Sequence, residues 1–224
     1  MDNVIQKMIS VKYEKLAAAL EANNMAPHWA DNAAEAKNAV SELLCNGDTV
    51  SHGGSMTLAQ CGIIELLKSG RYNYLDRNAP GLKPEEVDKI YRDTFFADAY
   101  ITSTNAITLN GELYNVDGNS NRIAPMLFGP KMVIVVAGYN KIVNNLNDAV
   151  TRVKTIAAPA NCIRLNKDTY CRNTGRCVSA VNSGAFMCDG CKSADRICRN
   201  YVVMGPQRIS GRVHVIIVGE ELGY

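Results

Sequence analysis

The sequence predicts an α/β protein, because three observations along the chain agree. Helix-type and strand-type segments alternate throughout, as in α/β folds. The stretch KMVIVVAG is an almost uninterrupted apolar run, which is typical of a strand buried on both faces of a mostly parallel sheet. A glycine pair, Gly53 and Gly54, separates a predicted strand from a predicted helix, a usual place for a ligand-facing turn in such folds.

The first half of the chain supplies three predicted helices before residue 71. Apolar residues recur at steps of three and four over 4–22, which predicts an amphipathic helix. A second helix is expected over 33–44, with Asp31 as its N-cap. A short strand then leads into the glycine pair, and one helix is expected to run from its cap at Ser55 to Gly70. The stretch YNYLD predicts a strand, and KPEEVDKIYRDTFFAD predicts a further helix.

The second half begins with a predicted group of strands over ADAYITSTNAITLNGELYNVDG. Asn110 and Gly111 predict a two-residue hairpin turn of type I′. Helices are expected at NRIAPMLFG and LNDAVTRVKTIAAPAN, on either side of the apolar strand. A cysteine-rich segment at about 161–200 follows, and YVVM and RVHVIIVG predict the closing strands.

Composition narrows the class of protein. The 224 residues suit one domain over 1–224, with 47% hydrophobic and 21% charged residues. A net charge of +2 argues against nucleic acid and anionic membranes as partners. No signal peptide and no apolar stretch of about 20 residues is found, so a cytoplasmic protein with reduced thiols is expected.

The turn at Gly53 and Gly54, which follows a short predicted strand, is a candidate anion-binding site. Glycines at Gly53 and Gly54 let a ligand approach the backbone, and the following helix start offers free N–H groups. Ser55 and Thr57 add hydroxyl groups, and His52 adds a titratable ring. An ordinary tight turn with an N-cap explains the same spacing equally well, so both interpretations stay open.

Three stretches together resemble the LUD domain, the lactate-utilisation family. They are SHGGSMT, the segment from Ala97 to Gly138, and the C-terminal RVHVIIVGEELGY. The resemblance implies a three-layer α/β/α fold with a mixed, mostly parallel sheet, shared with sugar-phosphate isomerases and CoA transferases. It also places 102–106 and 119–122 near one ligand cleft. The candidate ligand-binding residues are therefore His52, Gly53, Gly54, Ser55, Thr57, Thr104, Asn105, Asn121 and Arg122.

Arg122 and the absence of a nearby carboxylate bear on the chemistry of this cleft. Arginine is a natural fork for a carboxylate or phosphate, although a salt bridge would explain it as well. CoA transferases of this fold use a glutamate near 102–106, but no Asp or Glu lies between Asp98 and Glu112. The sequence therefore argues against CoA transfer. No general acid–base pair is identifiable, and whether the protein is an enzyme stays open.

The cysteine-rich segment is the second candidate site, with Cys171, Cys177, Cys188, Cys191 and Cys198 as candidate metal ligands. The C-x2-C spacing at Cys188 and Cys191 lets two thiolates reach one metal ion, and nearby Arg and Lys residues favour thiolates. The segment is poor in large apolar residues, so a metal or redox role is predicted over buried, reduced thiols. Zinc and an iron–sulfur cluster both remain open as the bound group.

A predicted short helix limits which cysteines share a single ion. Ser193 is expected to cap a helix over ADRICRN. If 191–198 were all helical, Cys191 and Cys198 would lie about 10 Å apart along the axis, too far for one zinc ion. An iron–sulfur cluster relaxes this constraint.

The resemblance also bears on function and partners. Family members similar to this chain carry a cysteine-rich segment matching Cys171, Cys177, Cys191 and Cys198, whereas others lack it and work beside iron–sulfur proteins. The implied function is a component of iron–sulfur-dependent oxidation of lactate to pyruvate, with a cleft for a small anion or a phosphorylated or acyl ligand. Iron–sulfur protein partners and a homodimer are expected. The alternatives are a non-catalytic metal or thiol redox sensor and a sugar-phosphate-type enzyme, for which His52 is the nearest base.

Overall fold

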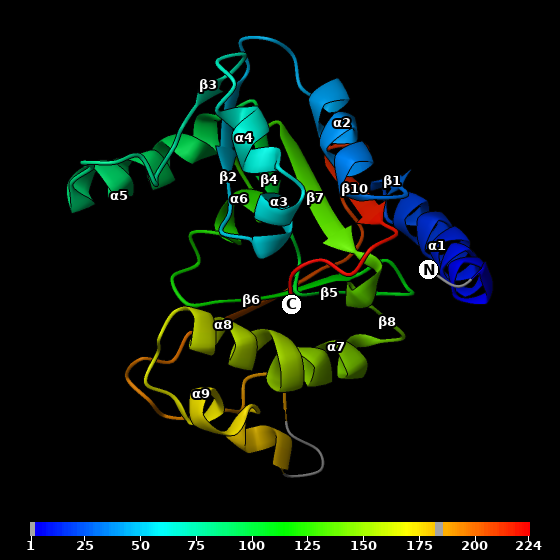
Figure 1. Ribbon diagram of the computed structural model, residues 1–224, viewed down its shortest axis with the longest axis vertical. Coiled ribbons are helices and arrows are strands. Elements are labelled where there is room, and N and C mark those ends of the chain that lie inside the picture. The colour runs from blue at the N-terminus through cyan, green and yellow to red at the C-terminus, as the bar shows by residue number, and fades with distance from the viewer. Residues whose placement is uncertain (1–2, 182–185) are drawn as a thin grey trace.

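The computed structural model describes residues 3–181 and 186–224, and its framework is a six-stranded parallel sheet (Figure 1). The strands in spatial order are β1 (Ala26–Ala30), β10 (Val213–Val218), β7 (Met132–Gly138), β4 (Ala99–Thr102), β2 (Thr49–His52) and β3 (Asn73–Tyr74). The central strands β7 and β10 pair with Val135 opposite Val215. Their side chains are buried on both faces, as the apolar run predicted. The predicted α/β class with a mostly parallel sheet is confirmed.

A second sheet of four strands lies beside the first. It contains β8 (Ile142–Val143), β5 (Ala106–Thr108), β6 (Leu113–Asp117) and β9 (Asn200–Met204), in this order. The β5–β8 pair is parallel, whereas β6 pairs antiparallel with both β5 and β9. The sequence did not predict this separate sheet. Of the two strands that were expected to close the chain, β9 belongs to this second sheet and β10 to the main sheet.

Helices surround this double layer, and several of them pack on its outer faces. They are α1 (Asn3–Ala22), α2 (Ala33–Leu43), α3 (Met56–Gln60), α4 (Ile63–Leu67), α5 (Pro84–Asp93), η1 (Thr94–Phe96), α6 (Ala124–Leu127), η2 (Tyr139–Lys141), α7 (Leu146–Arg152), the π-helical η3 (Val153–Ala157), α8 (Ala158–Arg164), α9 (Tyr170–Thr174) and η4 (Val178–Val181). Within the described residues, none of these helices is long and apolar enough to cross a membrane.

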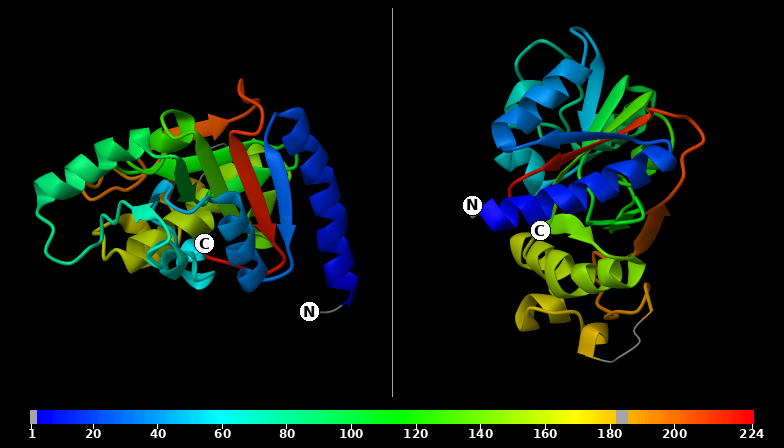
Figure 2. Two further views of the ribbon diagram at one scale, coloured as in Figure 1. Left: turned by 90° about the horizontal axis from the view of Figure 1, so that it is seen from above. Right: turned by 90° about the vertical axis from the view of Figure 1, so that its right-hand side faces the viewer.

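Three hydrophobic clusters hold the layers together. The first joins α2, α3 and α4 to one face of the main sheet. The second joins its other face to α1, α6 and the second sheet, and α1 runs beside β1 at the sheet edge (Figure 2). The third packs α7, η3 and α8 against the far face of the second sheet, through Ala106, Tyr114 and Val153. The layers are thus helix, sheet, sheet and helix.

Several local predictions differ from the structure. Asn32, rather than Asp31, caps α2 through its side chain. The helix expected from Ser55 to Gly70 is broken into α3 and α4 at Gly62, which has a left-handed backbone. The segment after Ser193 forms a turn and no helix, although the Ser193 hydroxyl accepts from Asp195 N–H as a helix cap would.

The hairpin turn also differs from the two-residue I′ turn that was predicted. Thr108 N–H donates to Glu112 O at 2.9 Å, which leaves a three-residue loop over 109–111. Gly111 has a φ of +78°, whereas Asn110 is not in the positive-φ region that a type I′ turn requires there. The loop is therefore the three-residue kind that ends in a left-handed glycine.

Candidate functional site

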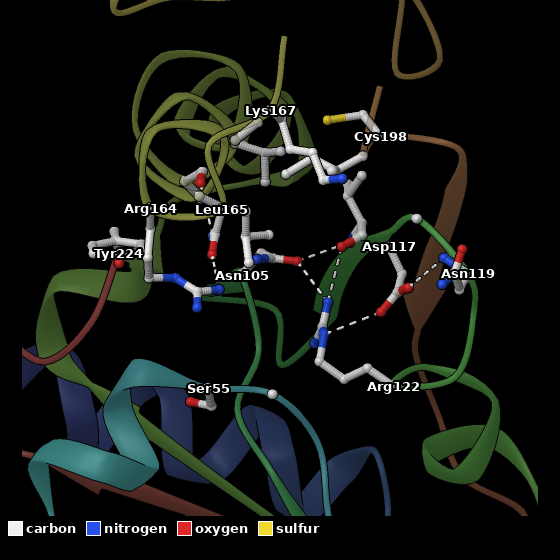
Figure 3. A pocket seen from close by; sticks show the side chains of 18 of the residues that line it. Ser55, Asn105, Asp117, Asn119, Arg122, Arg164, Leu165, Lys167, Cys198 and Tyr224 are labelled. Carbon is white, nitrogen blue, oxygen red and sulfur yellow. Dashed lines mark hydrogen bonds and ion pairs between the residues drawn. The ribbon is translucent and has the colours of Figure 1, made fainter. Parts of the chain in front are cut away.

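A cleft of about 410 Å³ lies at the carboxyl ends of the main-sheet strands, the usual ligand position in open α/β folds (Figure 3). One wall comes from residues that follow β2, β4, β7 and β10, and they are Gly54, Ser55, Ser103, Thr104, Asn105, Lys141, Gly223 and Tyr224. The opposite wall comes from the end of α8 and the segment 194–199. The cleft thus opens between the main sheet and the cysteine-rich part of the chain.

Lys141 is a buried cation in the wall of this cleft. Its side chain lies at the end of η2, just after the central strand β7, and the residue is only 3% exposed. Nζ donates to Thr57 Oγ1 at 2.9 Å and to Ser103 Oγ at 3.0 Å, which are both neutral acceptors. Among the described residues, no carboxylate forms an ion pair with it. Burial, and secondarily the charges of Arg152 and Arg122, lower the pKa of Lys141 to about 7.

Arg77 is a second cation that lines the cleft. Its Nη2 lies so close to the glycine turn that a Cβ on Gly54 would approach it to 2.9 Å. Nη1 donates to the Tyr91 hydroxyl at 3.3 Å, and the guanidinium lies over the Tyr91 ring. The Nε atom is buried and has no hydrogen-bond partner among the described residues. The glycine turn therefore lies beside a cation that retains an unused donor.

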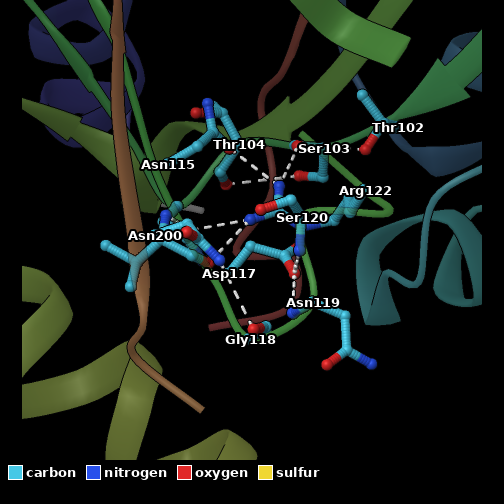
Figure 4. Close-up of polar contacts among 12 residues, drawn as sticks. Thr102, Ser103, Thr104, Asn115, Asp117, Gly118, Asn119, Ser120, Arg122 and Asn200 are labelled. Carbon is cyan, nitrogen blue, oxygen red and sulfur yellow. Dashed lines mark hydrogen bonds and ion pairs between the residues drawn. The ribbon is translucent and has the colours of Figure 1, made fainter. Parts of the chain in front are cut away.

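Arg122 is fully engaged within the protein (Figure 4). Its Nε forms an ion pair with Asp117 at 3.3 Å. The other guanidinium N–H groups donate to Ser103 O, Asn115 Oδ1, Asn105 Oδ1 and Val116 O. These five contacts occupy all five N–H donors of an arginine. Arg122 therefore joins the β4–β5 loop to strand β6, and it keeps no free N–H donor for a ligand.

His52 lies at the end of β2, buried, and is not among the residues that line the cleft. One ring nitrogen bonds to the Tyr74 hydroxyl at 2.8 Å. Burial, and secondarily the charge of Arg77, lower the pKa of His52 to about 4, so the ring is neutral at physiological pH. Its position does not suit a base acting on a ligand in the cleft.

The two glycines of the turn differ in their surroundings, and Gly53 is not among the residues that line the cleft. A Cβ on Gly53 would lie 2.6 Å from both Thr102 Oγ1 and the Tyr100 hydroxyl, so this position is closed to any side chain. Gly54 lines the cleft. Ser55 does so too, and its hydroxyl also caps α3, as predicted.

Of the remaining predicted residues, three line the cleft and one lies buried behind it. Thr104, Asn105 and Asn121 line the cleft. Thr57 is buried behind it, where it accepts from Lys141 and donates to Leu222 O at 3.3 Å. Asn105 uses its amide oxygen to accept from Val116 N–H and Arg122. The structure thus gathers most of the predicted residues around one cleft.

A second, much smaller cavity gathers five cysteines behind the cleft. They are Cys162, Cys171, Cys177, Cys191 and Cys198. Cys188, which was predicted as a ligand, is exposed and lies outside this cavity. All eight cysteines are free thiols. Over the described residues, no three His, Cys, Asp or Glu side chains are arranged to hold a single metal ion.

The two cavities share a wall, which the sequence did not lead us to expect. Cys198 and its neighbour Ile197 line both, as do Val153 and Ala158. Figure 3 shows Cys198 near Lys167 on the side of the cleft that faces away from the sheet. The cysteine cluster therefore lies one layer of side chains from the cleft.

Sequence reasoning missed Lys141 and Arg77. The signal for Lys141 was present, because it follows the carboxyl end of the most apolar strand, where ligands bind in open α/β sheets. Arg77 lies in an irregular segment after β3, and no spacing rule connects it to the glycine turn. Only the folded chain brings it there.

Comparison with known families assigns the chain. The model of the LUD domain matches residues 13–218. The chain belongs to the LUD domain family. At the level of the family it is a lactate-utilisation-like protein, and the resemblance noted from its sequence is confirmed.

One similar solved structure supports the fold. A DUF162 family protein from Deinococcus radiodurans is 17% identical with a TM-score of 0.50, over 95% of this chain and 97% of that one. The delta subunit of eIF2B from Chaetomium thermophilum is 18% identical over 51% of this chain and 49% of that one, with a TM-score of 0.34. At these identities the first likeness concerns the fold alone. No curated protein matches the chain.

Proposed function

We propose that the cleft binds the carboxylate of a small 2-hydroxy or 2-oxo acid, and that this LUD protein acts in the oxidation of lactate to pyruvate. The observation that supports this most strongly is the buried ammonium group of Lys141, which faces only neutral hydroxyl groups. Burying an unpaired charge is costly, and an anionic ligand offsets that cost. A lactate or pyruvate carboxylate has the charge and size to do so.

The surroundings of Lys141 suit a small polar acid. Ser55 and Ser103 place hydroxyl groups in the cleft, and Arg77, which also lines it, has its Nη2 atom beside Gly54. These groups can bind the second carboxylate oxygen and the hydroxyl or keto oxygen. Oxidation of lactate to pyruvate releases two electrons and two protons. The Cα–H and O–H bonds of lactate break as the C=O bond of pyruvate forms. We assign the two electrons to an iron–sulfur protein partner and the two protons to the solvent, and we propose the cytoplasm as the compartment.

Two other chemistries of this fold fit the cleft less well. CoA transfer needs a free carboxylate nucleophile. Of the two aspartates that line the cleft, Asp117 is paired with Arg122 and Asp195 with Lys167. A sugar-phosphate enzyme needs a base in contact with its ligand, and His52 lies outside the lining. Both observations favour a site that binds an anion over the site of a CoA transferase or of a sugar-phosphate enzyme.

The test is ligand binding to a variant that removes the charge of Lys141. Lys141→Met keeps much of the side-chain length but lacks the ammonium group. We expect wild-type protein to bind L-lactate or pyruvate at pH 6.5 in isothermal titration calorimetry, and the variant to lose at least tenfold in affinity, since a charge-assisted hydrogen bond is worth about 1.5–3 kcal/mol.

Lys154→Met is the matched control. Lys154 is also a buried lysine held by two oxygens, Ser179 Oγ and Asp189 O, but it does not line the cleft. Its loss should leave the affinity unchanged. If neither acid binds wild-type protein, or if both variants bind equally well, Lys141 is not an anion site. A protein that only sensed metals or oxidants would bind neither acid.

A further inference from the structure

The cleft is larger than a three-carbon acid requires. Its volume of about 410 Å³ lies within the range of about 300–1,000 Å³ that is typical of pockets for drug-sized ligands. Lys141 lies on the wall formed after the main-sheet strands, whereas the opposite wall comes from the end of α8 and from 194–199. An acid held at Lys141 therefore leaves room toward the opposite wall.

The charges that line the cleft are mostly positive. Both of the side-chain carboxylates in the lining, Asp117 and Asp195, already form ion pairs with cations of the protein. Several other lining cations form no ion pair within 3–181 and 186–224, and they are Arg77, Lys141, Arg164, Arg196 and Arg199. One carboxylate at Lys141 balances only part of this charge, so the cleft favours a ligand with more than one negative group.

Arg164 is the cation of the opposite wall that has the most N–H donors available to a ligand. Arg196 and Arg199 donate to backbone carbonyls between residues 188 and 198. In the described part of the chain, the Arg164 guanidinium makes one hydrogen bond, from Nη2 to Asn161 Oδ1 at 2.9 Å. Since an arginine has five N–H donors, Arg164 keeps most of them for a ligand.

Asn161 fixes the direction of the Arg164 side chain. Both residues belong to α8, and Asn161 Nδ2 donates to Ala157 O at 2.9 Å, which leaves Oδ1 to accept from Arg164. Figure 3 shows the Arg164 side chain reaching from α8 into the cleft, on the side that faces Ser55. Arg164 and Lys141 thus approach the cleft from opposite walls, and a ligand between them can contact both.

We propose that Arg164 forms an outer subsite of the cleft, which binds a second anionic group at the far end of a 2-hydroxy or 2-oxo acid. This group is a carboxylate or a phosphate, because the planar guanidinium fork matches both. The inference rests on the proposed acid site at Lys141. It extends the ligands of that site from three-carbon acids to acids with two anionic ends.

The experiment is calorimetric titration of the full chain at pH 6.5 with 2-oxo acids that differ at the far end. 2-Oxopentanoate and 2-oxoglutarate have the same chain length, but only 2-oxoglutarate has a terminal carboxylate. 3-Phosphohydroxypyruvate carries a phosphate in its place. We expect wild-type protein to bind at least one of the two doubly anionic acids at least tenfold more tightly than 2-oxopentanoate, since hydrogen bonds between charged groups are strong. The acid that gains affinity identifies the second group.

Arg164→Met removes the guanidinium, and Arg172→Met is the matched control. Arg172 is an exposed arginine on the neighbouring helix α9 and does not line the cleft. Arg164→Met should lose most of the preference for the doubly anionic acid and keep its affinity for 2-oxopentanoate. Arg172→Met should keep the affinities of wild-type protein for both ligands.

The outer subsite and the acid site at Lys141 can fail separately. The proposal is overturned if wild-type protein binds singly and doubly anionic acids equally well, or if Arg164→Met keeps the preference. If pyruvate and 2-oxopentanoate still bind in these cases, the acid site stands and only the outer subsite is wrong. If wild-type protein binds none of the acids, the proposed function and this inference are both wrong.

Discussion

At the scale of single residues, the cleft depends on one buried lysine and on one arginine whose N–H donors are all used within the protein. Lys141 carries a charge without an acidic partner in the described part of the chain. Every N–H donor of Arg122, in contrast, contacts another group of the protein. The sequence analysis predicted Arg122 as a ligand-binding residue and did not identify Lys141. An arginine in a predicted ligand loop looks like an anion fork, but the sequence does not show how many backbone carbonyls it will meet.

The depressed pKa of Lys141 predicts how stability changes with pH. In the folded state the pKa is about 7, and in the unfolded chain it returns to its ordinary value of 10.5. Between these values the unfolded state binds the extra proton, so the free energy of unfolding rises with pH. The full penalty of the buried charge applies below pH 7. Each pKa unit is worth about 1.4 kcal/mol, so the total gain amounts to several kcal/mol.

Denaturant unfolding of wild-type protein and Lys141→Met at several pH values between 6 and 10 measures this effect. The difference in stability between the two proteins should favour the variant most at pH 6 and shrink as pH rises. A difference that stays constant over this range would mean that Lys141 keeps its ordinary pKa.

At the scale of elements, periodicity predicted the long segments well and the turns poorly. The amphipathic α1 and the apolar β7 were found where expected, because their patterns extend over many residues. The break between α3 and α4 depends on one left-handed glycine, Gly62, which a helical pattern does not reveal. The β5–β6 loop likewise depends on Gly111, whose neighbours come from α1.

Gly111 tests the contact between this loop and α1. A Cβ at Gly111 would lie 2.9 Å from the backbone of Ala19, and Asn23 donates to Asn110 O and Gly111 O. Gly111→Ala should therefore lower the free energy of unfolding by about 1–3 kcal/mol from overpacking, in addition to the cost of its positive φ.

Gly211→Ala is the matched control for that backbone cost. Gly211 has a similar φ of +72°, but nothing lies within 4 Å of its Cβ position. Denaturant unfolding of both variants isolates the packing contribution. Equal losses of stability in the two variants would show that the loop does not press against α1.

At the scale of the whole molecule, two cavities meet across one wall. The predicted α/β class, the parallel sheet and the general position of the cleft followed from the alternation of elements and the strand ends. The second sheet could not be predicted, because its strands are short and its pairing joins β6 to β9 across more than 80 residues. That pairing carries the cysteine-rich segment to the cleft, which explains why sequence spacing alone treated the two sites as separate.

The central claim is that an acid anion supplies the missing countercharge of Lys141. Calorimetric titration of pyruvate at pH 8, repeated in buffers of different ionisation enthalpy, measures the protons taken up on binding. At this pH most of the free protein has neutral Lys141, because its pKa is about 7. An anion raises that pKa, so wild-type protein should take up close to one proton per ligand. Binding without proton uptake, or the same uptake by Lys141→Met, would contradict the account.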